Sequence, residues 1–342
     1  MLSDHTDESD QPMTTLTETR HQTKTAATDQ PAVRVDRLVK TYPDPEGGMF
    51  NAVDDLSFEV ASGEVLGILG PNGAGKSTTL EIIEGLQAPT SGSTSVFGLD
   101  SQADNAAMKT RIGVQLQASS YFEYLTLEEL LTLFGSFYPR SLPAAELLDK
   151  VGLLGKRKAL VGQLSGGQAQ RFSIVAAMVN NPQIVFLDEP TTGLDPQARH
   201  NLWDLIRSIN ENDGKTVVMT THYMEEAEEL SHRVAIIDTG QIQALDTPVG
   251  LISNLAADHN VVFTSGRPII DDSLESLPAV TTVRARSNGV HSYELGTRSP
   301  SQTVPALFKL AAIRSFDVAD LQVHAPTLED VFLNVTGRSL RD

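Results

Sequence analysis

The stretch from Gly70 to Thr78, which reads GPNGAGKST, constrains the fold of this chain more than any other segment. It follows the apolar run EVLGIL, typical of a buried strand, and precedes STTLEIIEGL, whose apolar spacing predicts a helix. Glycines let successive backbone N–H groups point at phosphate oxygens, and the helix that follows adds its positive N-terminal end. The order strand, glycine loop, helix therefore predicts an α/β fold with a phosphate site, in preference to an ordinary glycine turn.

This segment, called the phosphate loop below, fits the pattern G-x-x-x-x-G-K-[ST]. The side chain of Lys76 is expected to reach the β- and γ-phosphates of a nucleotide, and the hydroxyl of Ser77 to ligate Mg²⁺. The residues expected to contact the nucleotide here are Gly70, Pro71, Asn72, Gly73, Ala74, Gly75, Lys76, Ser77 and Thr78.

Two adjacent carboxylates end a second apolar run, IVFLDEP. Open α/β sheets bind ligands at the carboxyl ends of their strands, which is where Asp188 and Glu189 are expected to lie. Asp188 is expected to hold the magnesium through a water. Glu189 is expected to orient and polarise the attacking water, a role that contributes about 10²- to 10⁴-fold in rate. An acidic turn after a strand is the alternative, and the phosphate loop favours the catalytic interpretation.

The length of 342 residues favours about two domains. Residues 1–31 are rich in acid, Thr and Gln and lack an apolar segment, so we expect a disordered acidic tail and no signal peptide. Residues 32–240 alternate β-branched runs with helical stretches, which predicts a mostly parallel sheet flanked by helices. From about 118 to 180 helical spacing replaces the β-runs, indicating an inserted helical subdomain.

Residues 241–342 predict a small α+β module of the ferredoxin-like kind, with a hairpin turn at 287–289. A last helix is expected at 327–337, with Leu328, Val331, Phe332 and Val335 on its packed face. The expected order is strand, helix, strand, strand, helix, strand, at residues 260–265, 271–277, 280–286, 290–295, 301–313 and 317–324.

Composition excludes several classes of function. The sequence has no cysteine, which rules out thiol catalysis and Cys-ligated metal sites. Its net charge of −18 argues against sequence-independent binding of nucleic acid, because such binding depends on many basic side chains. No apolar run approaches the roughly 18 to 20 residues that cross a bilayer, so we expect a cytoplasmic protein without a spanning segment.

With four further motifs, the phosphate loop and the acidic pair resemble the nucleotide-binding subunits of ATP-binding cassette (ABC) transporters, over about residues 32–240. The resemblance implies a P-loop NTPase fold with a mixed, mostly parallel core sheet, an antiparallel β subdomain and the helical subdomain. The motifs that resemble those of the family are GPNGAGKST (Walker A), Gln117 in IGVQLQ (Q-loop), LSGGQ at 164–168 (signature), IVFLDEP (Walker B), GLDP (D-loop) and His222 in TTHYMEE (switch histidine).

In similar proteins two cassettes pack head to tail, and each ATP lies between the Walker A loop of one and the signature of the other. The resemblance therefore implies a second copy, or a similar subunit, as partner. A hydroxyl and N–H groups at a helix start form an anion site without a lysine, suited to closing over a phosphate held elsewhere. Ala169 departs from the long polar or Met residue often found after the signature. The signature residues concerned are Ser165, Gly166, Gly167 and Gln168.

The resemblance assigns four more residues. Gln117 is expected to touch Mg²⁺ and the attacking water; Gln115 is the alternative, and register with the family's usual IGYLPQ favours Gln117. His222 is expected to contact the γ-phosphate. Asp195 is assigned to the nucleotide site, with a turn and helix cap as the alternative. Tyr42 is expected to stack on adenine, or else to be a packed aromatic; the insertion PDPEGGMF lengthens its loop.

The tail PTLEDVFLNVTGRSLRD resembles that of ATPase subunits of daunorubicin-resistance-type exporters, which serve ABC-2 type permeases. It implies an ATPase that energises a separate permease at the cytoplasmic face of the membrane, exporting a drug, lipid or glycan. A soluble ABC protein acting on ribosomes or nucleic acid is one alternative, disfavoured by the single Walker A loop and the acidic balance. A non-hydrolysing switch is another, disfavoured because Lys76, Glu189 and His222 are all present.

Overall fold

The fold is that of a computed structural model of the 342-residue chain. It describes residues 30–44, 47–116, 121–255, 259–269, 272–287 and 291–337. The expected tail therefore lies almost wholly outside the described residues, as do Gln117 and the hairpin turn's last two residues.

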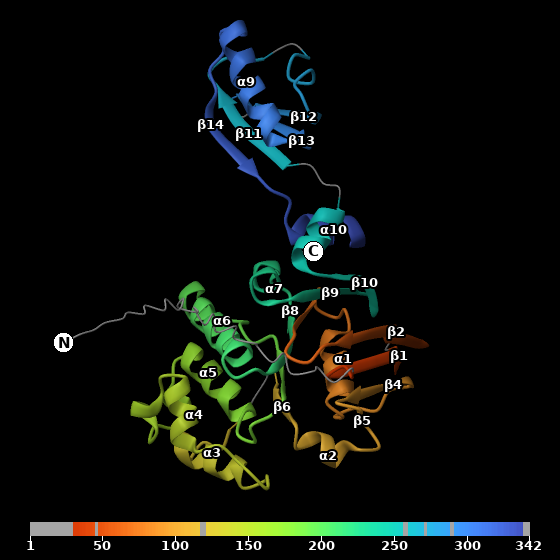
Figure 1. The fold of residues 1–342 in the computed structure, drawn as a ribbon, viewed down its shortest axis with the longest axis vertical. Coiled ribbons are helices and arrows are strands. Elements are labelled where there is room, and N and C mark those ends of the chain that lie inside the picture. Colours follow the sequence, from red (N-terminus) through yellow and green to blue (C-terminus); the bar gives the residue numbers. More distant parts are fainter. Residues whose placement is uncertain are drawn as a thin grey trace, which may run out of the picture.

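A six-stranded sheet forms the centre of the molecule (Figure 1). Five strands are parallel and β10 pairs antiparallel with β9, in the order β10-β9-β3-β8-β7-β6. Side chains of β7 alternate between two apolar clusters, which is why the strand reads as a continuous apolar run. The strands are β3 (Val65–Leu69), β6 (Ile112–Gln115), β7 (Ile184–Asp188), β8 (Thr216–Thr221), β9 (Arg233–Asp238) and β10 (Gln241–Asp246).

An antiparallel sheet of the order β2-β1-β4-β5 covers one face of the core. Helix α1 (Lys76–Ile83) lies between the two sheets, because its buried Leu80, Ile82 and Ile83 belong to the cluster that both sheets share. Helix α2 follows β5. The elements are β1 (Val33–Pro43), β2 (Met49–Val60), β4 (Ser91–Val96), β5 (Leu99–Asp100) and α2 (Asn105–Lys109).

The other face carries helices. The segment between β6 and β7 is helical, as expected, and its buried side chains pack with Val185 and Leu187 of the core sheet. Helix α6 (Pro196–Glu211) adds to the same cluster, and α7 (Met224–Leu230) connects β8 to β9. The helices of the insertion are α3 (Leu127–Gly135), α4 (Ala144–Lys150) and α5 (Gly166–Ala177), with single 3₁₀ turns at Leu154–Lys156 and Val161–Gln163.

The C-terminal module has its own four-stranded antiparallel sheet, in the order β12-β13-β11-β14, with its own apolar cluster. The helix expected at 271–277 is wrong: the described residues 272–277 form turns. Pro278 follows directly, and so short a segment gains too few hydrogen bonds to offset nucleation. The module's elements are β11 (His259–Ser265), β12 (Val280–Ser287), β13 (His291–Thr297), α9 (Pro300–Arg314) and β14 (Ala319–His324).

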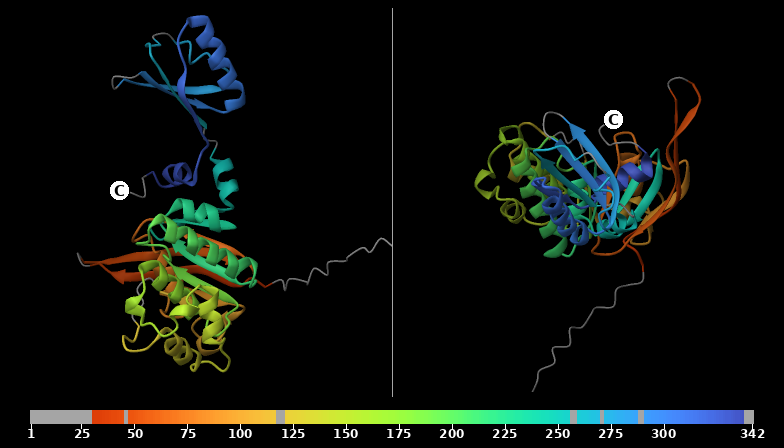
Figure 2. Two further views of the ribbon diagram at one scale, coloured as in Figure 1. Left: turned by 90° about the vertical axis from the view of Figure 1, so that its left-hand side faces the viewer. Right: turned by 90° about the horizontal axis from the view of Figure 1, so that it is seen from above.

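The predicted boundary at residue 240 divides a hairpin, because β10 pairs with β9 in the core sheet. The chain then leaves the ATPase core through α8 (Pro248–Asn254) and returns to it through α10 (Leu328–Thr336). Leu328, Val331, Phe332 and Val335 of α10 pack with Ala227 of α7, as the sequence pattern of α10 predicts for its apolar face. Figures 1 and 2 show the module standing beyond these two helices.

None of the helices in the described part of the chain is both long and apolar enough to cross a membrane.

Candidate nucleotide site

The phosphate loop is held closely by backbone from two sides. A Cβ atom on Gly70 would lie 2.2 Å from the Ile237 carbonyl oxygen, and one on Gly75 would lie 2.2 Å from that of Ala52. Gly75 also precedes α1 in the left-handed region, at φ 98°. Glycine is therefore required at both positions, by space and, at Gly75, by backbone conformation as well.

Lys76 is buried and curls back over the loop. Its Nζ donates to the carbonyl oxygens of Gly70 (2.8 Å) and Pro71 (3.0 Å) and lies 3.3 Å from Glu189 Oε1. Burial lowers the pKa of Lys76, and the negative charges of Glu189 and Asp188 oppose that shift. Three oxygen partners thus fix the ammonium group at the phosphate loop.

The two carboxylates converge on the phosphate loop. Ser77 Oγ donates to Asp188 Oδ1 at 3.1 Å, while Glu189 faces Lys76. Successive side chains of a strand would point to opposite faces. Glu189 escapes that alternation because it has left the strand with a φ of 47°, a conformation that costs a non-glycine residue energy and is found at functional sites.

Glu189 is surrounded by groups that favour its ionised form. Burial raises the pKa of the carboxyl, but Lys76, His222 and the hydroxyl of Thr192 outweigh burial and lower it. Thr192 Oγ1 donates to Glu189 Oε2 at 3.1 Å, and His222 Nδ1 lies 3.3 Å from the same oxygen. A buried, ionised carboxylate beside a histidine is suited to orient and polarise a water.

Thr220 is a site residue that the sequence reasoning missed. Its hydroxyl donates to Asp188 Oδ1 and accepts the Glu189 backbone N–H at 2.9 Å. The parallel register of β7 and β8 places Asp188 opposite Thr220. That register, and the position of Thr220 two residues before His222, is the signal that could have identified it.

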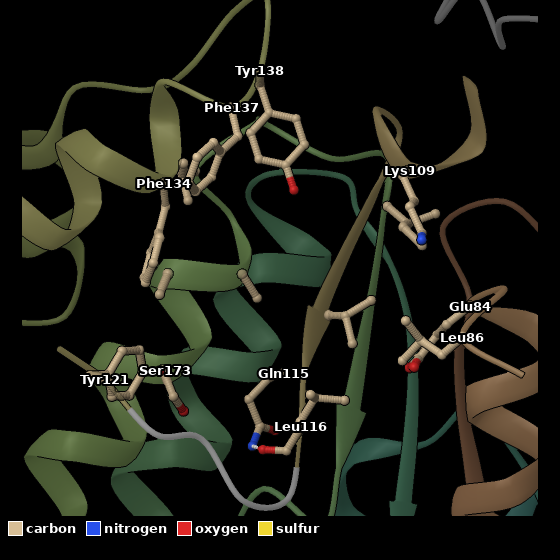
Figure 3. Close-up of a pocket in the computed structure, with 15 residues that line it drawn as sticks. Glu84, Leu86, Lys109, Gln115, Leu116, Tyr121, Phe134, Phe137, Tyr138 and Ser173 are labelled. Atoms are coloured by element: carbon tan, nitrogen blue, oxygen red, sulfur yellow. Dashed lines mark hydrogen bonds between the residues drawn. The ribbon is translucent and has the colours of Figure 1, made fainter. Parts of the chain in front are cut away.

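The donors at this edge fit a magnesium ion. Ser77 and Asp188 supply the hydroxyl and carboxylate oxygens that Mg²⁺ prefers. Gln117, the third expected ligand, lies outside the described residues. The alternative, Gln115, is buried, and its Nε2 donates to the Leu116 carbonyl oxygen at 2.7 Å. It lines a cavity of about 440 Å³ beside the helical subdomain (Figure 3).

The signature residues occupy a different surface. Ser165 is exposed and precedes α5, and its backbone N–H donates to Gln168 Oε1 at 3.2 Å. A cavity of about 400 Å³ is lined by Ser165, Gly166, Gly167 and Gln168 together with Asp195. Within the described residues, the phosphate loop contributes nothing to its lining. One copy of the chain therefore carries two separate candidate phosphate surfaces.

Asp195 and Tyr42 have local partners. Asp195 caps α6 by accepting the Ala198 backbone N–H at 2.9 Å, while its surroundings also form the wall of the signature cavity. The Tyr42 hydroxyl donates to Gln87 Oε1 at 2.6 Å, and its ring centroid lies 6.0 Å from that of Phe50. Both nucleotide-binding assignments stay predictions.

Comparisons with known proteins agree with this geometry. The family described as ABC transporter matches residues 53–192. The Nod factor export ATP-binding protein I of Paraburkholderia xenovorans (strain LB400) is 37% identical over 319 residues, covering 91% of this chain and 99% of that protein. The linearmycin resistance ATP-binding protein LnrL of Bacillus subtilis (strain 168) is 37% identical over 321 residues, covering 91% and 100%.

A solved structure shares the fold of the ATPase core. The dimeric ATP-binding cassette MJ0796, bound to ADP and Pi in a post-hydrolysis state, is 30% identical with a TM-score of 0.57, over 63% of this chain and 98% of that chain. The chain therefore belongs to the ABC transporter family, as one of its ATP-binding and ATP-hydrolysing subunits.

Proposed function

We propose that two copies of this chain, or one copy and a similar subunit, clasp ATP between them to drive a separate membrane permease. The observation that carries this proposal is the separation of the phosphate loop from the signature cavity on one chain. The dimeric cassette MJ0796 supports it by analogy. The dimer then has two ATP sites, and each copy supplies the phosphate loop of one site and the signature of the other.

In this proposal the chain's own groups divide the work. The N–H groups of the phosphate loop and Lys76 hold the β- and γ-phosphates, Glu189 orients the attacking water, and His222 fixes the geometry around Glu189. The partner's signature then covers the γ-phosphate with a hydroxyl and N–H groups. Mg²⁺, held by Ser77 and Asp188, would neutralise charge on the phosphates.

We place the permease contact at the cavity beside the helical subdomain. Aromatic side chains of Tyr121, Phe134, Phe137 and Tyr138 line it, and Phe137 is 70% exposed (Figure 3). Exposed apolar side chains gathered in one place mark interaction sites. Glu84, Lys109 and Gln115 also line this cavity and add polar groups to it. An apolar segment of a permease at the cytoplasmic face would bury it, making this chain a peripheral membrane protein.

Export is the direction that we propose. The relatives named for Nod factor export and linearmycin resistance match 91% of this chain, which includes most of the C-terminal module. The substrate class that follows by analogy is a drug, lipid or glycan. No feature of the described residues favours ribosomes or nucleic acid as the target instead.

A direct test uses the purified chain with Mg-ATP. Hydrolysis should occur, and Glu189→Gln should form a stable dimer on ATP binding, because it retains the phosphate contacts and loses the base. A Glu189→Gln protein that stays monomeric at saturating ATP would contradict the composite site. Co-purification with a candidate permease, compared between wild type and Phe137→Asp, tests the docking surface.

A further inference from the structure

One buried carboxylate outside the nucleotide site joins two helices that carry site residues. Glu226 lies on α7, one turn after His222, and its side chain is completely buried. Its Oε1 accepts a hydrogen bond at 3.2 Å from Nε1 of Trp203, which is 2% exposed and belongs to α6. Because Asp195 of the D-loop caps the N-terminus of α6, this bond ties the D-loop helix to the helix that follows the switch histidine.

A second contact joins α6 to Tyr223, which directly precedes α7. The Arg199 guanidinium of α6 lies over the Tyr223 ring, with its carbon 4.2 Å from the ring centroid. The Tyr223 ring in turn packs on that of His222, with centroids 4.1 Å apart. The turn that carries His222 therefore contacts α6 on one side, through Tyr223. On the other side, His222 Nδ1 lies 3.3 Å from Glu189 Oε2.

Stability alone does not account for a carboxyl group at this position. An apolar side chain of similar size would avoid the cost of burying a charge. Burial raises the pKa of Glu226, and Thr221, Thr191, Trp203 and Arg199 oppose the rise. Thr221 directly precedes His222, and Thr191 follows Glu189 by two residues. The bond that the carboxyl accepts from Trp203 links α6 to α7, directly after the turn that carries His222, whereas Glu226 Oε2 and Thr191 Oγ1 make no hydrogen bond within the described residues.

We propose that Glu226 is a positioning residue for ATP hydrolysis, which holds α7 against α6 so that His222 stays beside Glu189. It touches neither nucleotide nor water in this role, and it acts through Trp203 and the turn at His222. A displacement of about 1 Å in an active-site group costs about 10²-fold in rate, so a bond between helices can control kcat without contributing to ATP binding.

The test compares Glu226→Ala and Glu226→Gln, with Glu225→Gln as the matched control. We expect Ala to lower kcat about 10- to 100-fold with the KM for ATP changed less than about 3-fold, because the phosphate loop is untouched. Gln keeps an oxygen for the Trp203 indole and should restore most of the lost kcat. Glu225 is exposed on the same helix, and its substitution should leave kcat unchanged.

Trp203 supplies an independent readout, because the chain has one tryptophan. Mg-ATP should change its fluorescence in the wild-type protein, and Glu226→Ala should abolish that change. If the Ala variant does not fold, the kinetics of Glu226→Gln and Trp203→Phe test the proposal instead. Trp203→Phe should lower kcat and leave the KM for ATP unchanged. A folded Ala or Phe variant with kcat within about 2-fold of wild type overturns the proposal, as does a loss that Gln does not relieve.

Discussion

The Lys76 ammonium lies 3.3 Å from Glu189 Oε1, and the two side chains are 4% and 6% exposed. The phosphate-binding cation and the proposed base are therefore one buried ion pair. Removing one partner of such a pair leaves an uncompensated buried charge. The effects of substituting the two residues on the free energy of unfolding should therefore be strongly coupled.

Lys76→Met should reduce ATPase activity by at least about 10²-fold, because it removes the cation that meets the phosphates. It should also destabilise the protein by about 3–5 kcal/mol, since Glu189 stays buried without its partner. The double variant Lys76→Met/Glu189→Gln carries neither charge and should recover much of that stability. Chemical denaturation of the wild type, the two single variants and the double variant measures the coupling, and additive losses would contradict a paired site.

Glu84 should make stability depend on pH. Burial, aided by the negative charges of Asp188 and Glu81, raises the pKa of Glu84 to about 8. A raised pKa means that the folded state binds the proton more tightly than the unfolded state does. Protonated Glu84 therefore contributes to the free energy of unfolding, and this contribution is complete below about pH 4.5. It declines by about 1.4 kcal/mol per unit as pH rises toward 8.

The neutral isostere Glu84→Gln should remove that decline. We expect it to melt at a higher temperature than wild type at pH 8 and to lose this advantage at pH 5. The exposed Glu123→Gln is the control and should follow wild type at both values. Equal melting temperatures of Glu84→Gln and wild type at pH 8 would show that Glu84 ionises without penalty.

Gly75→Ala and Gly73→Ala should separate steric exclusion from backbone strain. Both glycines have positive φ, 98° and 80°, and either Ala costs about 1–2 kcal/mol in that region. A Cβ on Gly73 meets nothing within 4 Å, whereas one on Gly75 meets the Ala52 carbonyl. The free energy of unfolding should therefore fall further for Gly75→Ala, and equal losses for the two variants, measured by chemical denaturation, would refute the steric account.

Asp195 should serve two separable roles. Asp195→Ala removes the cap of α6 and should cost about 1 kcal/mol of stability, whereas Asp195→Asn keeps a capping oxygen and should not. If the carboxylate also acts across the dimer, both variants should weaken the ATP-dependent dimer of the Glu189→Gln protein. Sedimentation would show an unchanged dimer for Asn if Asp195 is a cap alone.

Much of the fold follows from patterns that are local in sequence. The phosphate loop, the acidic pair and the alternating runs predict the α/β core because each motif carries its own turn or strand chemistry. The helix expected at 271–277 failed since its apolar spacing is compatible with buried turns, in which Leu274 and Leu277 still reach the module's core.

Other features depend on contacts between distant segments. Asp188 and Glu189 converge because Glu189 has a positive φ, and a glutamate in the sequence does not predict that conformation. The role of Thr220 rests on the register between β7 and β8, and the pairing of Glu226 with Trp203 rests on how α6 packs on α7. Tertiary packing decides such relationships, so periodicity alone could not predict them.

The composite site is tested most directly by mixing two inactive proteins, Lys76→Met and Ser165→Arg. Ser165 is exposed at the signature, so the substitution should block that surface without unfolding the chain. A mixed dimer has one intact phosphate loop facing one intact signature, and we predict ATPase activity well above the sum of the separate proteins. If mixing restores no activity although the two variants fold and associate, the proposal that two copies share each ATP is contradicted.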